Sequence, residues 1–139
     1  MGCDIHSHAE QQDSGRWVGL DVEAFKRRDY GLFGWLAGVR NYSRLAPIAA
    51  RRGFPADASQ KAANDYDIWR GDAHSESWVS VAELAALDYE QIVETGGGTC
   101  EPSQVKKQTL REFLGPDYFA VLRRLQEACA DRVVFWFDN

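Results

Sequence analysis

The chain has 139 residues, of which 45% are hydrophobic and 27% charged, a composition typical of globular proteins and unlike that of disordered ones. The net charge is −5 and the Lys and Arg residues are scattered, which disfavours nucleic-acid binding because that function needs a concentrated basic face. The three cysteines are widely spaced without a CxxC pair, which indicates reduced thiols in a cytoplasm. No apolar run approaches the roughly 20 residues that span a bilayer, so we expect no membrane partner.

The N-terminus predicts a β-hairpin. Between residues 3 and 10 the odd-numbered side chains are small or apolar and the even-numbered ones are polar, which is the period of a strand with one buried face. Residues 12–15 carry a turn signal, and residues 16–22 alternate again.

The middle of the chain predicts short helices. A helical segment begins near Asp29, a candidate N-cap, and ends between Gly38 and Asn41. A second short helix is expected over residues 59–69, followed by a polar loop over residues 71–77. Ser80 and Glu83 have the spacing of a capping box, which begins a third helix.

The C-terminal third predicts helices followed by a buried strand. A turn or helix is expected over residues 89–94, and Gly96-Gly97-Gly98 is interpreted as a connector because it lacks the spacing of a phosphate-binding loop. Residues 103–114 and 116–130 predict two helices, the second with Pro116 in its first turn. Residues 132–139 are almost continuously apolar, as in a strand buried on both faces at the centre of a sheet.

Together these elements predict an α+β fold in a single domain over residues 1–139. The N-terminal hairpin and the C-terminal strand would share one small sheet, packed by about four to five helices, with the hairpin strands at its edges.

The first strand carries the strongest candidate site. Asp4, His6, His8 and Glu10 occupy alternate positions on one face, where neighbours lie about 6.5–7 Å apart. His and carboxylate side chains at this spacing can converge on one cation. The competing interpretation is a polar face that is solvated or hydrogen-bonded to a covering helix.

A second candidate group lies between Asp72 and Trp78. Asp72 and His74 would place a carboxylate and an imidazole on a loop, where functional residues concentrate. If that loop folds against the first strand, all three histidines of the chain would meet, with Asp72 orienting them or acting as a further metal ligand. The alternative is that Asp72 forms an Asx-turn and His74 packs beside Trp78.

A third group is Arg40 with Asn41. The planar guanidinium of Arg40 suits a carboxylate or phosphate, although a cation at a helix end also serves as a cap. Cys3 is assigned to the core, because it lies on the apolar face opposite the histidines.

Several strings of the sequence resemble a family of small uncharacterised proteins of bacteriophages, prophages and actinobacteria. They are the opening MGCDIH with Glu10, the RDY-LF segment that follows Arg28, the GVRN segment ending at Asn41, the DAHS segment beginning at Asp72, and the closing VFWFDN. The resemblance implies that Asp4, His6 and Glu10 belong to the family's opening motif, whereas the position of His8 often carries another residue. It also implies a bacterial host cell as the location and is consistent with a role in host takeover or anti-defence, without naming an activity.

Two functions follow from these residues. The first is binding of a small polar ligand, including a nucleotide, or of a host protein, by a pocket that collects the three groups: Asp4, His6, Glu10, Arg40, Asn41, Asp72, His74 and Trp78. The alternative is a small metal-dependent hydrolase or phosphoesterase. In that enzyme Asp4, His6, Asp72 and His74 would hold a divalent metal, and Glu10 or His74 would act in catalysis, Glu10 as general base. We favour binding, because the metal spacing matches no recognised signature.

Overall fold

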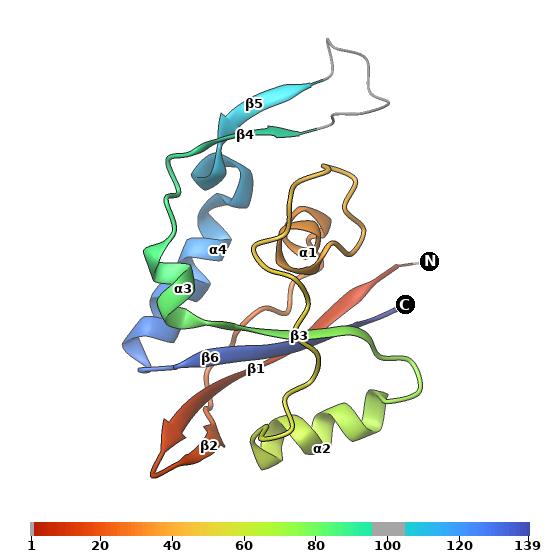
Figure 1. Ribbon diagram of the computed structural model, residues 1–139, viewed down its shortest axis with the longest axis vertical. Coiled ribbons are helices and arrows are strands. Elements are labelled where there is room, and N and C mark those ends of the chain that lie inside the picture. Colours follow the sequence, from red (N-terminus) through yellow and green to blue (C-terminus); the bar gives the residue numbers. More distant parts are fainter. Residues whose placement is uncertain (1, 96–104) are drawn as a thin grey trace. The chain divides into compact units, whose positions relative to one another are not determined.

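The computed structural model describes residues 2–95 and 105–139 and has the predicted α+β fold (Figure 1). The chain forms two compact units. Unit 1 comprises Met1–Arg28, Arg51–Ala86 and Ala120–Asn139, and unit 2 comprises Asp29–Ala50 and Leu87–Phe119. The single domain over residues 1–139 stays a prediction.

Unit 1 is built on a four-stranded antiparallel sheet in the order β2–β1–β6–β3. Its strands are β1 (Asp4–Asp13), β2 (Arg16–Gly19), β3 (His74–Ser80) and β6 (Arg132–Asp138). The predicted hairpin is confirmed. Its two-residue turn contains Ser14 and Gly15, both at positive φ (52° and 81°), as a type I′ turn requires.

Strand β6 is the centre of the sheet and of the core, as its apolar sequence predicts. It lies between β1 and β3, and its side chains from Val133 to Phe137 are 0% exposed. Cys3 is also fully buried, which confirms its assignment to the core. One edge of the sheet is the hairpin strand β2, as predicted, whereas the other edge is β3.

Helix α2 (Gln60–Trp69) covers the face of the sheet that carries the even-numbered side chains of β1. Ser59 is its N-cap and accepts a hydrogen bond from the Ala62 N–H (3.2 Å), which confirms the predicted helix. The ring of Tyr66 packs edge-on against Trp136 of β6, with centroids 5.2 Å apart.

Strand β3 is the main departure from the prediction in unit 1. The predicted polar loop over residues 71–77 is wrong for its second half, because His74–Ser77 pair with β6. A bulge lies between His74 and Ser77, with Ser75 at φ 58°, and this irregularity hides the alternation that would identify a strand. Helix α3 (Val81–Ala86) follows directly, and the capping box of Ser80 and Glu83 is confirmed by two hydrogen bonds of 2.6 and 3.1 Å.

Unit 2 contains α1 (Tyr30–Ala37), the hairpin of β4 (Ile92–Thr95) and β5 (Lys106–Thr109), and the first part of α4 (Leu110–Glu127). Asp29 caps α1 through the Leu32 N–H, and Gly38 ends it at φ 74°, as predicted. The core of the unit includes Trp35 packed edge-on against Tyr118, whose hydroxyl lies 2.5 Å from that of Tyr89.

Two predictions for unit 2 need correction: the turn or helix over residues 89–94, of which only the turn at its start is found, and the helix over residues 103–114. Residues 92–95 are strand β4, and residues 106–109 are strand β5 instead of the first turns of a helix. The expected boundary at Pro116 is confirmed as a kink, since Gly115 adopts φ 80°, ψ 172° inside α4. Gly96-Gly97-Gly98 lies outside the described residues. None of the helices in residues 2–95 and 105–139 has the length and apolar character needed to cross a bilayer.

Candidate functional site

Asp4 begins the polar row of β1 and is held by Arg28. The Nε and Nη2 atoms of Arg28 donate to the two carboxylate oxygens, each at 2.9 Å. This hydrogen-bonded guanidinium holds the pKa of Asp4 below its usual range. Asp4 is therefore occupied by a surface ion pair.

His6 lies between two tryptophans under helix α2. Its ring centroid is 4.2 Å from that of Trp69 on α2 and 5.7 Å from that of Trp136 on β6. Its Nε2 lies 2.5 Å from Oδ2 of Asp138, a residue near the other end of the chain that β6 places beside β1. The Asp138 carboxylate thus fixes the orientation of the imidazole.

His8 makes the same kind of contact one step along the strand. Its Nε2 lies 2.7 Å from Oδ2 of Asp65 on α2, and its ring also stacks on that of Trp136, with centroids 5.7 Å apart. His8 is 14% exposed and His6 is 20% exposed, so both imidazoles are partly accessible to solvent. His6 and His8 therefore have equivalent surroundings in the structure, whereas the family resemblance implies that the position of His8 often carries another residue.

Glu10 is sealed inside the protein. Its side chain is 0% exposed, its Oε1 accepts from Nε of Arg132 (2.6 Å), and its Oε2 accepts from the Ser59 N–H (2.6 Å). Arg132 also donates to Asp57 (3.1 Å) and lies over the ring of Trp17, 3.7 Å from its centroid. Glu10 joins β1, β6 and the start of α2, and this position does not support its predicted role as a general base.

The second candidate group does not join the first. His74 pairs with Phe137 of β6, so its side chain lies on the opposite face of the sheet from His6, which pairs with Trp136. The Nε2 of His74 lies 2.5 Å from Oδ1 of Asn139, and its ring stacks on Phe137. The predicted meeting of three histidines fails because the bulge in β3 sets the face on which His74 projects.

Asp72 and Trp78 also have local structural partners. The N–H of Asp72 donates to the carbonyl of Trp69 (2.8 Å) in the turn after α2. The ring of Trp78 lies under Arg52, 4.5 Å from the guanidinium carbon, and the carbonyl of Trp78 accepts from Nη1 of the same arginine. Neither residue is among those that line the pocket beside His6.

Arg40 and Asn41 belong to unit 2, where they shape the end of α1. Asn41 exchanges two side-chain hydrogen bonds with the main chain of Leu45, at 2.7 and 3.1 Å. Its side chain also packs so closely on Gly34 that a Cβ there would lie 2.6 Å from Oδ1. Arg40 lies over the ring of Tyr30. These contacts favour the interpretation that both residues end the helix.

The predicted metal set is not assembled. Among residues 2–95 and 105–139, no three His, Cys, Asp or Glu side chains converge in a way that could hold a metal ion. Three of the four predicted ligand side chains have other partners: Arg28 for Asp4, Asp138 for His6 and Asn139 for His74.

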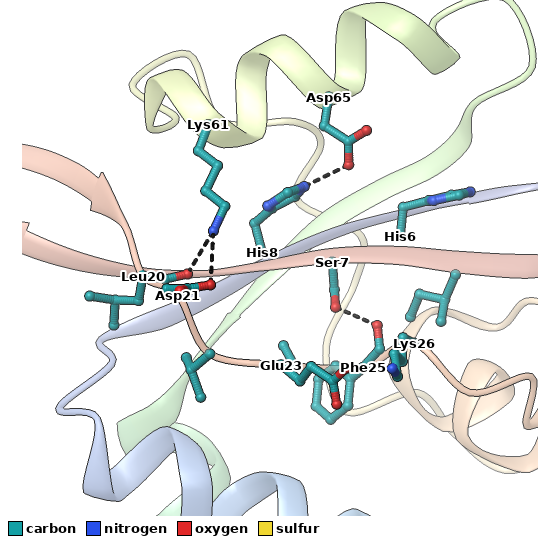
Figure 2. A pocket seen from close by; sticks show the side chains of 13 residues that line it. His6, Ser7, His8, Leu20, Asp21, Glu23, Phe25, Lys26, Lys61 and Asp65 are labelled. Atoms are coloured by element: carbon teal, nitrogen blue, oxygen red, sulfur yellow. Dashed lines mark hydrogen bonds and ion pairs between the residues drawn. The ribbon is translucent and has the colours of Figure 1, made fainter.

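A cavity of about 320 Å³ lies beside β1 in unit 1 (Figure 2). We call it the strand-edge cavity. It is lined by Ile5, His6, Ser7 and His8 of β1, by Lys61 and Asp65 of α2, and by residues 20–26, which we call the strap. Figure 2 shows His6, His8 and Asp65 on one side of β1 and Ser7 with Phe25 on the other. The cavity therefore borders both faces of the strand.

Sequence reasoning missed the residues of α2 that line this cavity. A signal was present, because Ala62, Asp65, Tyr66 and Trp69 follow the spacing of the helix face that packs on a sheet. A carboxylate on such a face needs a polar partner, and His8 is that partner. Lys61 lies one turn before Asp65 and so reaches the same cavity.

No protein-family model, curated protein or solved structure matches the chain. The resemblance to small phage and prophage proteins therefore stays a prediction, and the case for a function rests on the geometry of unit 1.

Proposed function

We propose that this protein binds a small polar ligand in the strand-edge cavity. The observation that supports the proposal most directly is the convergence of His6 and His8 on one cavity, each imidazole oriented by its own carboxylate. Small-molecule sites are concave, largely preformed and provided with a few fixed polar groups, and about 320 Å³ lies within their usual range of volumes.

The charges around the cavity indicate the kind of ligand. Two lysines, Lys26 and Lys61, face three carboxylates, those of Asp21, Glu23 and Asp65. Lys26 pairs with Glu23, and Lys61 lies 4.0 Å from Asp21. This balance favours a neutral or zwitterionic ligand over a polyanion, because a polyphosphate would meet more negative than positive groups. The alternative of metal-dependent hydrolysis gains no support from the separated carboxylates and histidines.

A melting screen tests the proposal. Purified protein is heated with nucleosides, nucleoside monophosphates, amino acids and sugars, one compound at a time. A true ligand at one hundred times its Kd adds about 2.7 kcal/mol of stability and raises Tm by on the order of 5–10 °C. Lys61→Met removes a donor from the cavity and should reduce the shift by more than half.

Lys107→Met is the matched control, because Lys107 is 69% exposed on β5 of unit 2, outside the cavity. It should leave the ligand-induced shift unchanged. A screen in which no compound raises Tm, or a shift that survives Lys61→Met in full, would contradict the proposal.

A further inference from the structure

Strand β1 has an edge that β2 does not cover. Strand β2 pairs with β1 only from Glu10 to Asp13, and the last main-chain bond on that side runs from the Leu20 N–H to the Ala9 carbonyl (2.9 Å). Main-chain groups of successive strand residues point to opposite edges. The Ile5 and Ser7 N–H and C=O groups therefore face the same edge as those of Ala9, beyond the end of β2.

These main-chain groups are unpaired in the described part of the chain. The Glu10 carbonyl accepts from the Asp131 N–H on the β6 side, which confirms that the even-numbered residues serve that edge. Within residues 2–95 and 105–139, no hydrogen bond reaches the main chain of Ile5 or Ser7 from the open side. Ile5 and Ser7 both line the strand-edge cavity, so a ligand in the cavity lies beside these unpaired groups.

The strap explains why the edge is open. With Glu10 opposite Gly19, a continued hairpin would place Val22 opposite Ser7. Instead, the Ser7 hydroxyl donates to the carbonyl of Phe25, which lies three residues further along. The extra residues carry the strap away from the edge of β1, and the strand-edge cavity occupies the space between them. The opening is therefore built into the register of the fold.

The surroundings of the edge select a flat ligand. A group that hydrogen-bonds to a strand edge lies in the plane of the sheet. Above that plane are the rings of His6 and His8, and below it is Phe25 of the strap (Figure 2). A planar ring in this plane passes between the side chains of the two faces, whereas a bulky three-dimensional ligand would meet them.

We propose that the main chain of Ile5 and Ser7 binds a ligand of the nucleobase class, a planar uncharged ring with a hydrogen-bond donor beside an acceptor. Each strand residue presents an N–H and a C=O together, which is the complement of such a ring edge. The excess of carboxylates over lysines in the lining agrees with recognition of the base and not of a phosphate. This inference rests on the proposed function of the cavity and specifies its ligand.

The test follows amide resonances of ¹⁵N-labelled protein during titration with adenosine, guanosine, cytidine and uridine. At least one nucleoside should bind and move the Ile5 and Ser7 amide resonances downfield, as new hydrogen bonds do. Methylation of the base nitrogen that donates should weaken binding roughly tenfold or more, because a buried carbonyl then loses its partner. Val22→Trp should abolish binding by filling the cavity.

Val18→Trp is the matched control, since Val18 is already 40% exposed on β2 and does not line the cavity. It should leave nucleoside binding unchanged. If an amino acid or sugar from the melting screen binds in the cavity while every nucleoside leaves the Ile5 and Ser7 amides unmoved, the inference is wrong and the proposed function stands. If no compound of either panel binds, both are wrong.

Discussion

The polar face of β1 has two ends with opposite character. At one end, Glu10 is completely buried against Arg132 and the start of α2. At the other, His6 and His8 are partly exposed and line the strand-edge cavity. We call these the sealed end and the open end. One alternating pattern in the sequence thus produces a structural clamp and a candidate binding site within a few residues.

The difference arises from what lies beside each end. At the sealed end β2 completes the edge of the sheet, and Trp17 and Asp57 enclose Arg132. At the open end β2 has stopped and the strap has moved away, so solvent reaches the histidines. The polar face of β1 therefore forms a candidate binding site only along the part of the strand whose edge does not pair with β2.

The largest expected effect is at the sealed end. Arg132→Met should cost about 3–5 kcal/mol of unfolding free energy, because it leaves the Glu10 carboxylate buried without its partner. Chemical denaturation measures the loss. The double variant Glu10→Gln with Arg132→Met also removes the unpaired buried charge, so it should recover part of the lost unfolding free energy. A loss below about 1 kcal/mol for Arg132→Met would show that the clamp is not the stabilising end.

At the open end we expect a substitution to change stability little and ligand affinity strongly. His8→Gln keeps a polar side chain near Asp65 and should cost only about 1 kcal/mol of stability, yet it should weaken ligand binding roughly tenfold. Calorimetric titration with the ligand found by the melting screen measures the affinity. Trp17→Leu, at the sealed end, should leave that affinity unchanged. If His8→Gln and Trp17→Leu change the ligand affinity equally, the division of the strand into a sealed end and an open end is wrong.

How far the sequence predicts this arrangement depends on the element. The alternation of residues 3–10, the apolar run of β6 and the capping residues of α1 and α3 are local patterns, and they predicted these elements correctly. The bulge in β3 and the β4–β5 hairpin were missed, because their short strands lack clear alternation. The partners of β1 were not predictable, since Asp65, Arg132 and Asp138 are far away in sequence and only the strand register brings them near.

A smaller, pH-dependent effect should appear next to the sealed end. Hydrogen bonds from Arg52, at 2.6 and 2.9 Å, lower the pKa of Glu83. The folded state therefore favours the ionised carboxylate, so the stabilisation is complete above the unfolded-state pKa of Glu and is lost as the pH falls through the lower folded-state value. Glu83→Gln should cost about 1 kcal/mol near pH 7. The difference from the original protein should shrink as the pH is lowered below the unfolded-state pKa of Glu, as followed by urea denaturation, and a constant difference would contradict this account.

The smallest effect should come from His74, the histidine on the other face of the sheet. His74→Ala removes its hydrogen bond to Asn139 and its stacking on Phe137, at a cost of about 0.5–1 kcal/mol. Because its side chain projects away from His6 and His8, ligand-induced stabilisation should be the same with and without it. The melting screen repeated on His74→Ala measures this directly. Loss of the ligand-induced shift would mean that the site extends around the end of the sheet to include His74, and the open end of β1 would then be only one part of it.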